Sequence, residues 1–208
     1  MIKKIDIPYS FSSNEISLIK REYISYHDWE KEVFNDVKAK VIKHLRIEQN
    51  NRCCYCGKEL GFDIKDVDIE HIIPKSKYPK FCFEPKNLAL CCPACNTKKS
   101  HKDIVIKEIK RYPKTGANIS IIHAHYDNYA DHIDILEECL YVPKSSKGCE
   151  TIKVCELFRL HEVENKRKDF YSKNNPIMGL VMDFINSERQ SNKSKLLKEQ
   201  IINILSNC

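Results

Sequence analysis

The sequence predicts an α+β protein, with a small cysteine-rich core flanked by mainly helical N- and C-terminal segments. Cysteines concentrate in the middle of the chain, apolar side chains recur at helical spacing on both sides, and polar and apolar residues alternate between the cysteines. We therefore expect three parts: a helical segment over residues 1–50, the core over residues 51–103, and a mainly helical region over residues 104–208.

The composition is that of a globular protein. Of the 208 residues, 42% are hydrophobic and 31% are charged, which argues against disorder. The formal net charge of +6 permits a polyanionic partner without requiring one. No apolar run approaches the roughly 20 residues that a membrane span needs, and the first residues form no secretory leader. We expect a cytoplasmic protein.

The N-terminal segment predicts one long amphipathic helix, with Asp28 as its N-cap. A shorter helix is expected before it, over residues 15–24. The long helix is indicated by apolar side chains that repeat every four residues and so form one stripe: Trp29, Val33, Val37, Val41 and Leu45.

Three further helices are expected in the C-terminal region, after an irregular segment at residues 113–116. Thr151 is the expected cap of the first of them. Pro176 suits the first turn of the second, since proline needs no amide partner there. Ser191 or Asn192 is expected to open the last.

The cysteines point to a metal site. The chain has 11 of them, an odd number that cannot pair completely, and cytosolic thiols stay reduced. Two Cys-x-x-Cys pairs, each placing two thiolates on one tight turn, would complete a tetrahedral zinc shell. Buried free cysteines and redox use of one pair remain alternatives, and Cys54 and Cys91 adjoin the pairs. The predicted zinc ligands are Cys53, Cys56, Cys92 and Cys95.

The segment between the two pairs carries polar residues in a distinctive order. Alternation over residues 66–73 predicts a strand that Pro74 ends and that carries Glu70 and His71. Asn87 precedes a second short strand, and Asn96 follows the second cysteine pair at the expected start of a helix. This order resembles the HNH endonuclease motif, in its zinc-knuckle form with Asn in place of the last His. The resemblance implies a ββα-metal core.

The resemblance also implies roles for these residues. His71 would be the general base, Glu70 and Asn96 the ligands of a catalytic Mg²⁺ or Mn²⁺, and Asn87 would orient the loop that carries His71. The motif more often has Asp before the base, so Asp68 stays open as a substitute for Glu70. On a strand, neighbouring side chains leave opposite faces, so Glu70 and His71 share a face only if the strand end is distorted.

Lysines surround this segment and are expected to contact phosphate without reading sequence. A solvated surface is the alternative for each of them, including Lys77 and Lys80. Three lysines are the predicted nucleic-acid contacts: Lys75, Lys98 and Lys99.

A narrower resemblance extends beyond the core, to the PtuB-like HNH subunits of Septu antiphage systems. It is carried by the residues from Pro74 to Pro79, by Asn87-Leu88, and loosely by residues 125–132 and 147–160. It implies a bacterial nuclease that cleaves DNA together with an SMC/ABC-like ATPase, and the sequence itself has no Gly-rich phosphate loop. An RNA substrate such as tRNA, or a zinc-ribbon module that binds nucleic acid without cutting, are the alternatives.

Three histidines lie close together in the C-terminal region. His123, His125 and His132 stand near Asp127 and Asp131, an arrangement that a second metal, a substrate or partner contact, or ordinary packing and surface exposure would each explain.

Overall fold

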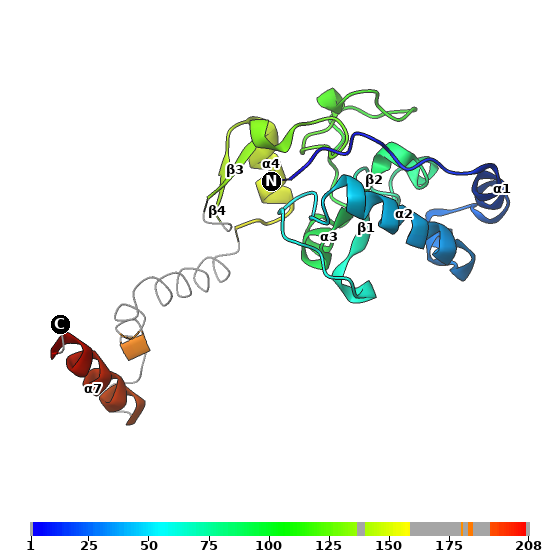
Figure 1. Ribbon diagram of the computed structural model, residues 1–208. Coiled ribbons are helices and arrows are strands. Elements are labelled where there is room, and N and C mark those ends of the chain that lie inside the picture. The colour runs from blue at the N-terminus through cyan, green and yellow to red at the C-terminus, as the bar shows by residue number, and fades with distance from the viewer. Residues whose placement is uncertain (1, 137–139, 159–179, 181–182, 185–191, 207–208) are drawn as a thin grey trace. The chain divides into compact units, whose positions relative to one another are not determined.

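The computed structural model describes residues 2–136, 140–158, 180, 183–184 and 192–206 (Figure 1). These residues contain both helices and strands, so the α+β class is confirmed. The helix expected at Pro176 lies outside them. No helix in the described ranges is long and apolar enough to cross a membrane. The helices are α1 (Ser13–Glu22), α2 (Asn35–Glu48), α3 (Pro93–Lys99), α4 (Ser146–Val154) and α7 (Asn192–Ser206), and the strands are β1 (Asp68–His71), β2 (Leu88–Cys91), β3 (Ile133–Leu136) and β4 (Leu140–Pro143).

The chain divides into two compact units. The first comprises residues 1–136 and 141–158, and the second comprises residues 137–140 and 159–208. In the second unit, α7 begins at Asn192, where the sequence predicts a helix start.

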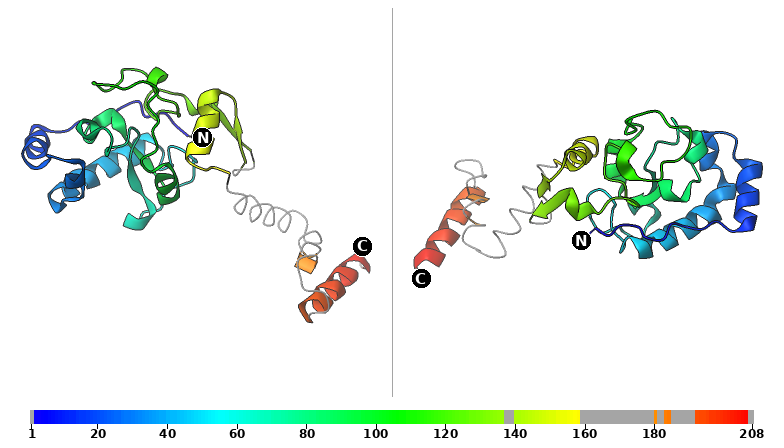
Figure 2. Two further views of the ribbon diagram at one scale, coloured as in Figure 1. Left: turned by 180° about the vertical axis from the view of Figure 1, so that it is seen from behind. Right: turned by 90° about the horizontal axis from the view of Figure 1, so that it is seen from above.

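The centre of the first unit is a two-stranded antiparallel sheet with a helix beside it (Figure 1). β1 pairs with β2 in a register that sets Asp68 opposite Cys91 and His71 opposite Leu88. All four residues of β2 are buried. α3 contacts β1, so the three elements form the expected ββα arrangement. Figure 2 shows α1, in blue, and α4, in yellow, at opposite ends of this unit.

α3 starts three residues earlier than we expected. Cys92 has extended backbone and Pro93 occupies the first helical turn, where its missing amide costs no hydrogen bond. Asn96 therefore lies inside the helix, one turn before Lys99. The helix ends at Lys99, and the residue that caps it, Ser100, has a φ of 46°.

The N-terminal segment corrects the prediction of one long helix. Asp28 does not cap an α-helix: its carboxylate accepts the amides of Ile24 and Ser25 at 2.8 and 2.7 Å, which closes a 3-10 turn over Tyr26–Glu30. A second short turn follows, and α2 begins only at Asn35. The apolar stripe is broken as a result. Val33 is exposed, while the other members of the predicted stripe are buried: Trp29, Val37, Val41 and Leu45.

The first part of the region after α3, residues 104–132, is irregular. Residues 104–132 contain two 3-10 turns, at Gly116–Asn118 and Tyr129–Asp131, and no α-helix. α4 is capped by Ser145, whose side chain accepts the amide of Gly148 at 3.0 Å, and not by Thr151. Thr151 lies inside α4, where its hydroxyl accepts the buried amide of Ile122 at 2.8 Å and so ties the helix to the preceding loop.

Candidate active site

The four predicted zinc ligands converge. Their sulfur atoms lie within 4.8 Å of one another, and those of Cys56 and Cys92 are 3.7 Å apart. A tetrahedral zinc–thiolate shell with bonds of about 2.3 Å places its sulfurs about 3.8 Å apart, so the spacing suits the ion. The first pair sits on a turn that needs a positive φ, supplied by Gly57 at 69°. Cys95 lies in α3, directly behind the turn at Pro93.

Burial raises the pKa of the Cys53 thiol. A sulfur in this setting stays protonated unless a cation compensates its charge, as a coordinated metal does. The two adjoining residues, Cys54 and Cys91, are also buried but are not part of the four-sulfur group.

His71 leaves β1 on the face opposite to Glu70. Its Nε2 lies 3.1 Å from the carbonyl oxygen of Cys82, and its ring meets that of Trp29 edge-on with centroids 4.6 Å apart. A carbonyl only accepts, so Nε2 carries the proton and Nδ1 is the unprotonated nitrogen. Burial, with smaller contributions from Lys75 and Lys99, lowers the pKa of His71 to about 3. The ring is therefore neutral at pH 7.

Glu70 faces α3, where it meets a lysine. Its Oε1 lies 2.6 Å from Nζ of Lys99 and accepts the hydroxyl of Tyr55 at 3.0 Å. Both carboxylate and ammonium are almost fully buried, with side-chain exposures of 3% and 1%. Burial raises the pKa of Glu70, and Lys99 opposes that rise. Lys99 also donates to the carbonyl of His71 at 2.9 Å. The lysine thus lies inside the core, whereas we expected it on the surface in reach of phosphate.

The helix asparagine meets the other acidic residue of β1. Nδ2 of Asn96 donates to Oδ2 of Asp68 at 2.9 Å. Asp68 and Glu70 share one face of the strand, and Asn96 and Lys99 share one face of α3. The carboxylate and amide oxygens gathered between β1 and α3 are the kind of ligand that hard divalent cations prefer. The two contacts that the structure gives the Glu70 carboxylate both fall on Oε1.

Asn87 is fully buried and ties two parts of the loop after His71 together. Its Oδ1 accepts the amide of Ile73 at 2.7 Å, and its Nδ2 donates to the carbonyls of Ile73 and Phe81 at 3.0 and 2.9 Å. Ile73 lies two residues after His71. Phe81 directly precedes Cys82, whose carbonyl accepts the hydrogen bond from the His71 imidazole. Asn87 therefore holds the base and its hydrogen-bond acceptor in one frame.

The other two predicted phosphate contacts lie on the surface. Lys75 is 3.3 Å from Glu30 and lies over the ring of Trp29, while Lys98 pairs with Glu156 at 2.6 Å. These ion pairs lie at the surface, where an ion pair contributes little to stability. A phosphate can therefore replace the carboxylate as the partner of either lysine.

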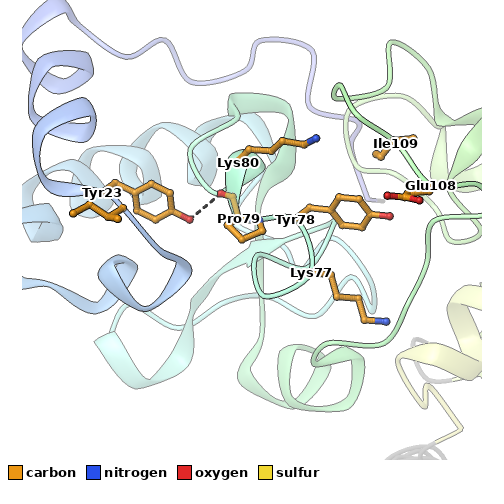
Figure 3. A pocket seen from close by; sticks show the side chains of 8 residues that line it. Tyr23, Lys77, Tyr78, Pro79, Lys80, Glu108 and Ile109 are labelled. Atoms are coloured by element: carbon orange, nitrogen blue, oxygen red, sulfur yellow. Dashed lines mark hydrogen bonds between the residues drawn. The ribbon is translucent and has the colours of Figure 1, made fainter.

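Lys77 and Lys80 border an open hollow of about 500 Å³ (Figure 3). Tyr23 and Tyr78 line it as well, and the hydroxyl of Tyr23 donates to the carbonyl of Pro79 at 2.8 Å. Both ammonium groups have partners: Lys77 pairs with an aspartate at 3.1 Å and Lys80 donates to a carbonyl at 2.6 Å.

The histidines of the C-terminal region are not brought together as a metal site. In the described part of the chain, the four cysteines form the only group that meets metal-ligand spacing. His132 contacts the hydroxyl of Ser145 at 2.7 Å, and His125 donates to the carbonyl of Leu88 at 2.9 Å. His123 contacts the hydroxyl of Tyr112 at 2.8 Å. Sequence reasoning passed over Tyr112, since no spacing signal marks it.

Comparisons with known proteins match the same region. Residues 53–102 match the family model described as HNH endonuclease. The Septu protein PtuB of Bacillus thuringiensis is 33% identical over 111 residues, which is 53% of this chain and 38% of that protein. A putative HNH endonuclease of retron Vc95 from Vibrio cholerae is 31% identical over 94 residues, 41% of this chain and 45% of that protein. The chain thus spans less than half the length of these curated relatives. No solved structure gives a significant match.

Proposed function

We propose that this chain, whose residues 53–102 match the HNH endonuclease family model, hydrolyses phosphodiester bonds of DNA as the nuclease of an antiphage defence system. The observation that carries the proposal is the neutral imidazole of His71 at the end of β1, held there by the carbonyl of Cys82 and by the loop that Asn87 ties together. The names of the relatives, a Septu protein and a retron protein, support the defence setting.

His71 is the proposed general base. Nδ1 is the unprotonated nitrogen and takes the proton of the attacking water, while Nε2–H stays bonded to the carbonyl of Cys82. That carbonyl stabilises the imidazolium that forms, because its dipole points at the side of the ring that gains charge. Asn87 keeps base and carbonyl in register through its bonds to Ile73 and Phe81.

The proposed ligands of a catalytic Mg²⁺ or Mn²⁺ are Glu70 and Asn96, with Asp68 as the substitute that already touches Asn96. Such a cation, when bound, offsets the negative charge that develops on the phosphate and the leaving oxygen. Lys99 orients Glu70 through Oε1. A structural Zn²⁺ is proposed for the four cysteines, where it would hold the two turns that bracket β1 and β2.

The proposed substrate is DNA, and the proposed partner is an ATPase. DNA is favoured by the resemblance to PtuB-like subunits, and so is an SMC/ABC-like ATPase as the partner. RNA stays the alternative substrate, because attack by water does not depend on the sugar. A zinc-ribbon module that binds without cutting is the second alternative. Lys75 and Lys98 are the proposed phosphate contacts in each case.

Cleavage of plasmid DNA and of total RNA with Mg²⁺ or Mn²⁺ tests the proposal, with and without an ATPase encoded beside the gene. We expect DNA cutting by the wild type that His71→Ala abolishes. His132→Ala is the matched control, since it removes an imidazole that contacts a serine hydroxyl away from the site, and should cut normally. Cutting of RNA alone would replace the substrate. Nucleic-acid binding without cutting under every condition would favour the binding module.

A further inference from the structure

The asparagine of the core is supported from outside the matched segment. Besides its loop contacts, Oδ1 of Asn87 lies 3.2 Å from the hydroxyl of Tyr112, which in turn lies 2.8 Å from Nε2 of His123. We infer that Tyr112 and His123 are positioning residues of the site, which fix the amide of Asn87 and through it the loop that carries His71. The inference rests on the proposed nuclease function.

The direction of the hydrogen bonds follows from one backbone contact. The amide of His125 donates to Nδ1 of His123 at 3.2 Å, so Nδ1 carries no proton. A neutral His123 then bears its proton on Nε2 and donates to the oxygen of Tyr112. Burial lowers the pKa of His123 well below its ordinary value, which keeps it neutral. The hydroxyl proton of Tyr112 is left to point away from His123.

That proton has two acceptors, the carbonyl of Lys86 at 2.9 Å and Oδ1 of Asn87 at 3.2 Å. Both belong to the short turn that leads into β2. Oδ1 of Asn87 also accepts the amide of Ile73, so two donors converge on it and the amide group cannot be flipped without losing both. The hydroxyl thus helps to determine which end of the amide faces Ile73.

Ring contacts hold the hydrogen-bonded chain from His123 through Tyr112 to Asn87, here called the relay, in place. The ring of Tyr112 meets that of Phe81 edge-on with centroids 5.2 Å apart, and the ring of Tyr126 stacks on His123 at 4.2 Å. Phe81 supplies a carbonyl to Asn87 through its backbone. A displacement of Tyr112 or His123 would therefore change the position of the strand end that carries His71 and of the carbonyl that accepts its imidazole N–H.

The test compares two tyrosines that each lose only a hydroxyl. Tyr112→Phe breaks the relay, while Tyr126→Phe removes a bond to the carbonyl of Pro113 in the same segment and keeps the stacking on His123. For Tyr112→Phe we expect kcat to fall about tenfold with KM unchanged, since the loss of one hydrogen bond weakens the frame without touching substrate. The Ile73 amide should also exchange with deuterium about tenfold faster. Tyr126→Phe should match the wild type in both measurements.

A second pair of variants tests the donor. In His123→Gln the side-chain amide nitrogen replaces Nε2 as donor to Tyr112, so kcat should stay near wild type, whereas His123→Leu should behave like Tyr112→Phe. Wild-type kcat in Tyr112→Phe, whether or not Ile73 exchanges faster, would overturn the inference. If the wild type cuts neither DNA nor RNA, the proposed nuclease function fails. In that case unchanged hydrogen exchange at the Ile73 amide in Tyr112→Phe would separately overturn the inferred link from Tyr112 to the loop.

Discussion

Replacing Lys99 by methionine distinguishes a buried structural lysine from a surface phosphate contact. Its ammonium lies 2.6 Å from Glu70, and the two side chains are 1% and 3% exposed. Removing it leaves a carboxylate without a counter-charge in the core, which typically costs about 3–5 kcal/mol. The lost bond to the carbonyl of His71 adds about 1 kcal/mol. We expect Lys99→Met to lower the free energy of unfolding by about 3–5 kcal/mol, since Glu70 relieves part of the cost by taking a proton.

Urea unfolding followed by tryptophan fluorescence measures this change, because the single tryptophan, Trp29, is buried against His71. The metal concentration must be held constant, since a bound ion adds to stability. Lys98→Met is the matched control: its pair with Glu156 is half-exposed on both sides, so a change within about 1 kcal/mol is expected.

The double variant Lys99→Met with Glu70→Gln should recover part of the loss, because the uncompensated charge is gone. A single Lys99→Met variant that unfolds within about 1 kcal/mol of wild type would refute the reasoning. If it also bound DNA with a shallower salt dependence, Lys99 would be the phosphate contact that its position in the sequence first indicated.

Three further outcomes are expected. Cys95→Ser should purify without zinc and with a lower thermal midpoint, whereas the exposed Cys149→Ser should retain one zinc by metal analysis. Mn²⁺ binding, followed by electron paramagnetic resonance, should weaken more in Glu70→Gln than in Asp68→Asn; the reverse order would make Asp68 the ligand. Burial lowers the pKa of His125 to about 4, so the unfolded chain, with a pKa of about 6.5, binds its proton first as the pH falls. Between pH 7 and 5 the wild type should lose about 2 kcal/mol more stability than His125→Gln, and parallel curves would contradict this.

Local spacing was sufficient to predict the cysteine cluster and the directions of the side chains on β1. Two Cys-x-x-Cys pairs can hardly serve a tetrahedral ion unless they meet, and the four sulfurs do converge. The period-two alternation before Pro74 marked β1, and the opposite directions of Glu70 and His71 followed from the pleat of the strand alone.

The long helix expected from Asp28 shows where such reasoning fails. Apolar residues at a spacing of four predict one helical face, but the spacing does not show whether the helix is continuous through all of them. The carboxylate of Asp28 competes for backbone amides and closes a 3-10 turn, which the periodicity could not reveal. Phe34 is then buried where Val33 was expected.

The sequence by itself determined the α+β class, the two cysteine pairs and the HNH-like order of residues in the central segment, because each depends on residue types at short spacing. Only the tertiary structure decided that Asn96 meets Asp68 while Lys99 is buried against Glu70, and that Tyr112 reaches Asn87. Asn96 and Asp68 are 28 residues apart, and Tyr112 and Asn87 are 25 apart. Helical spacing puts Asn96 and Lys99 on one face of α3, but only the packing of α3 against β1 determines whether that face meets solvent or a carboxylate.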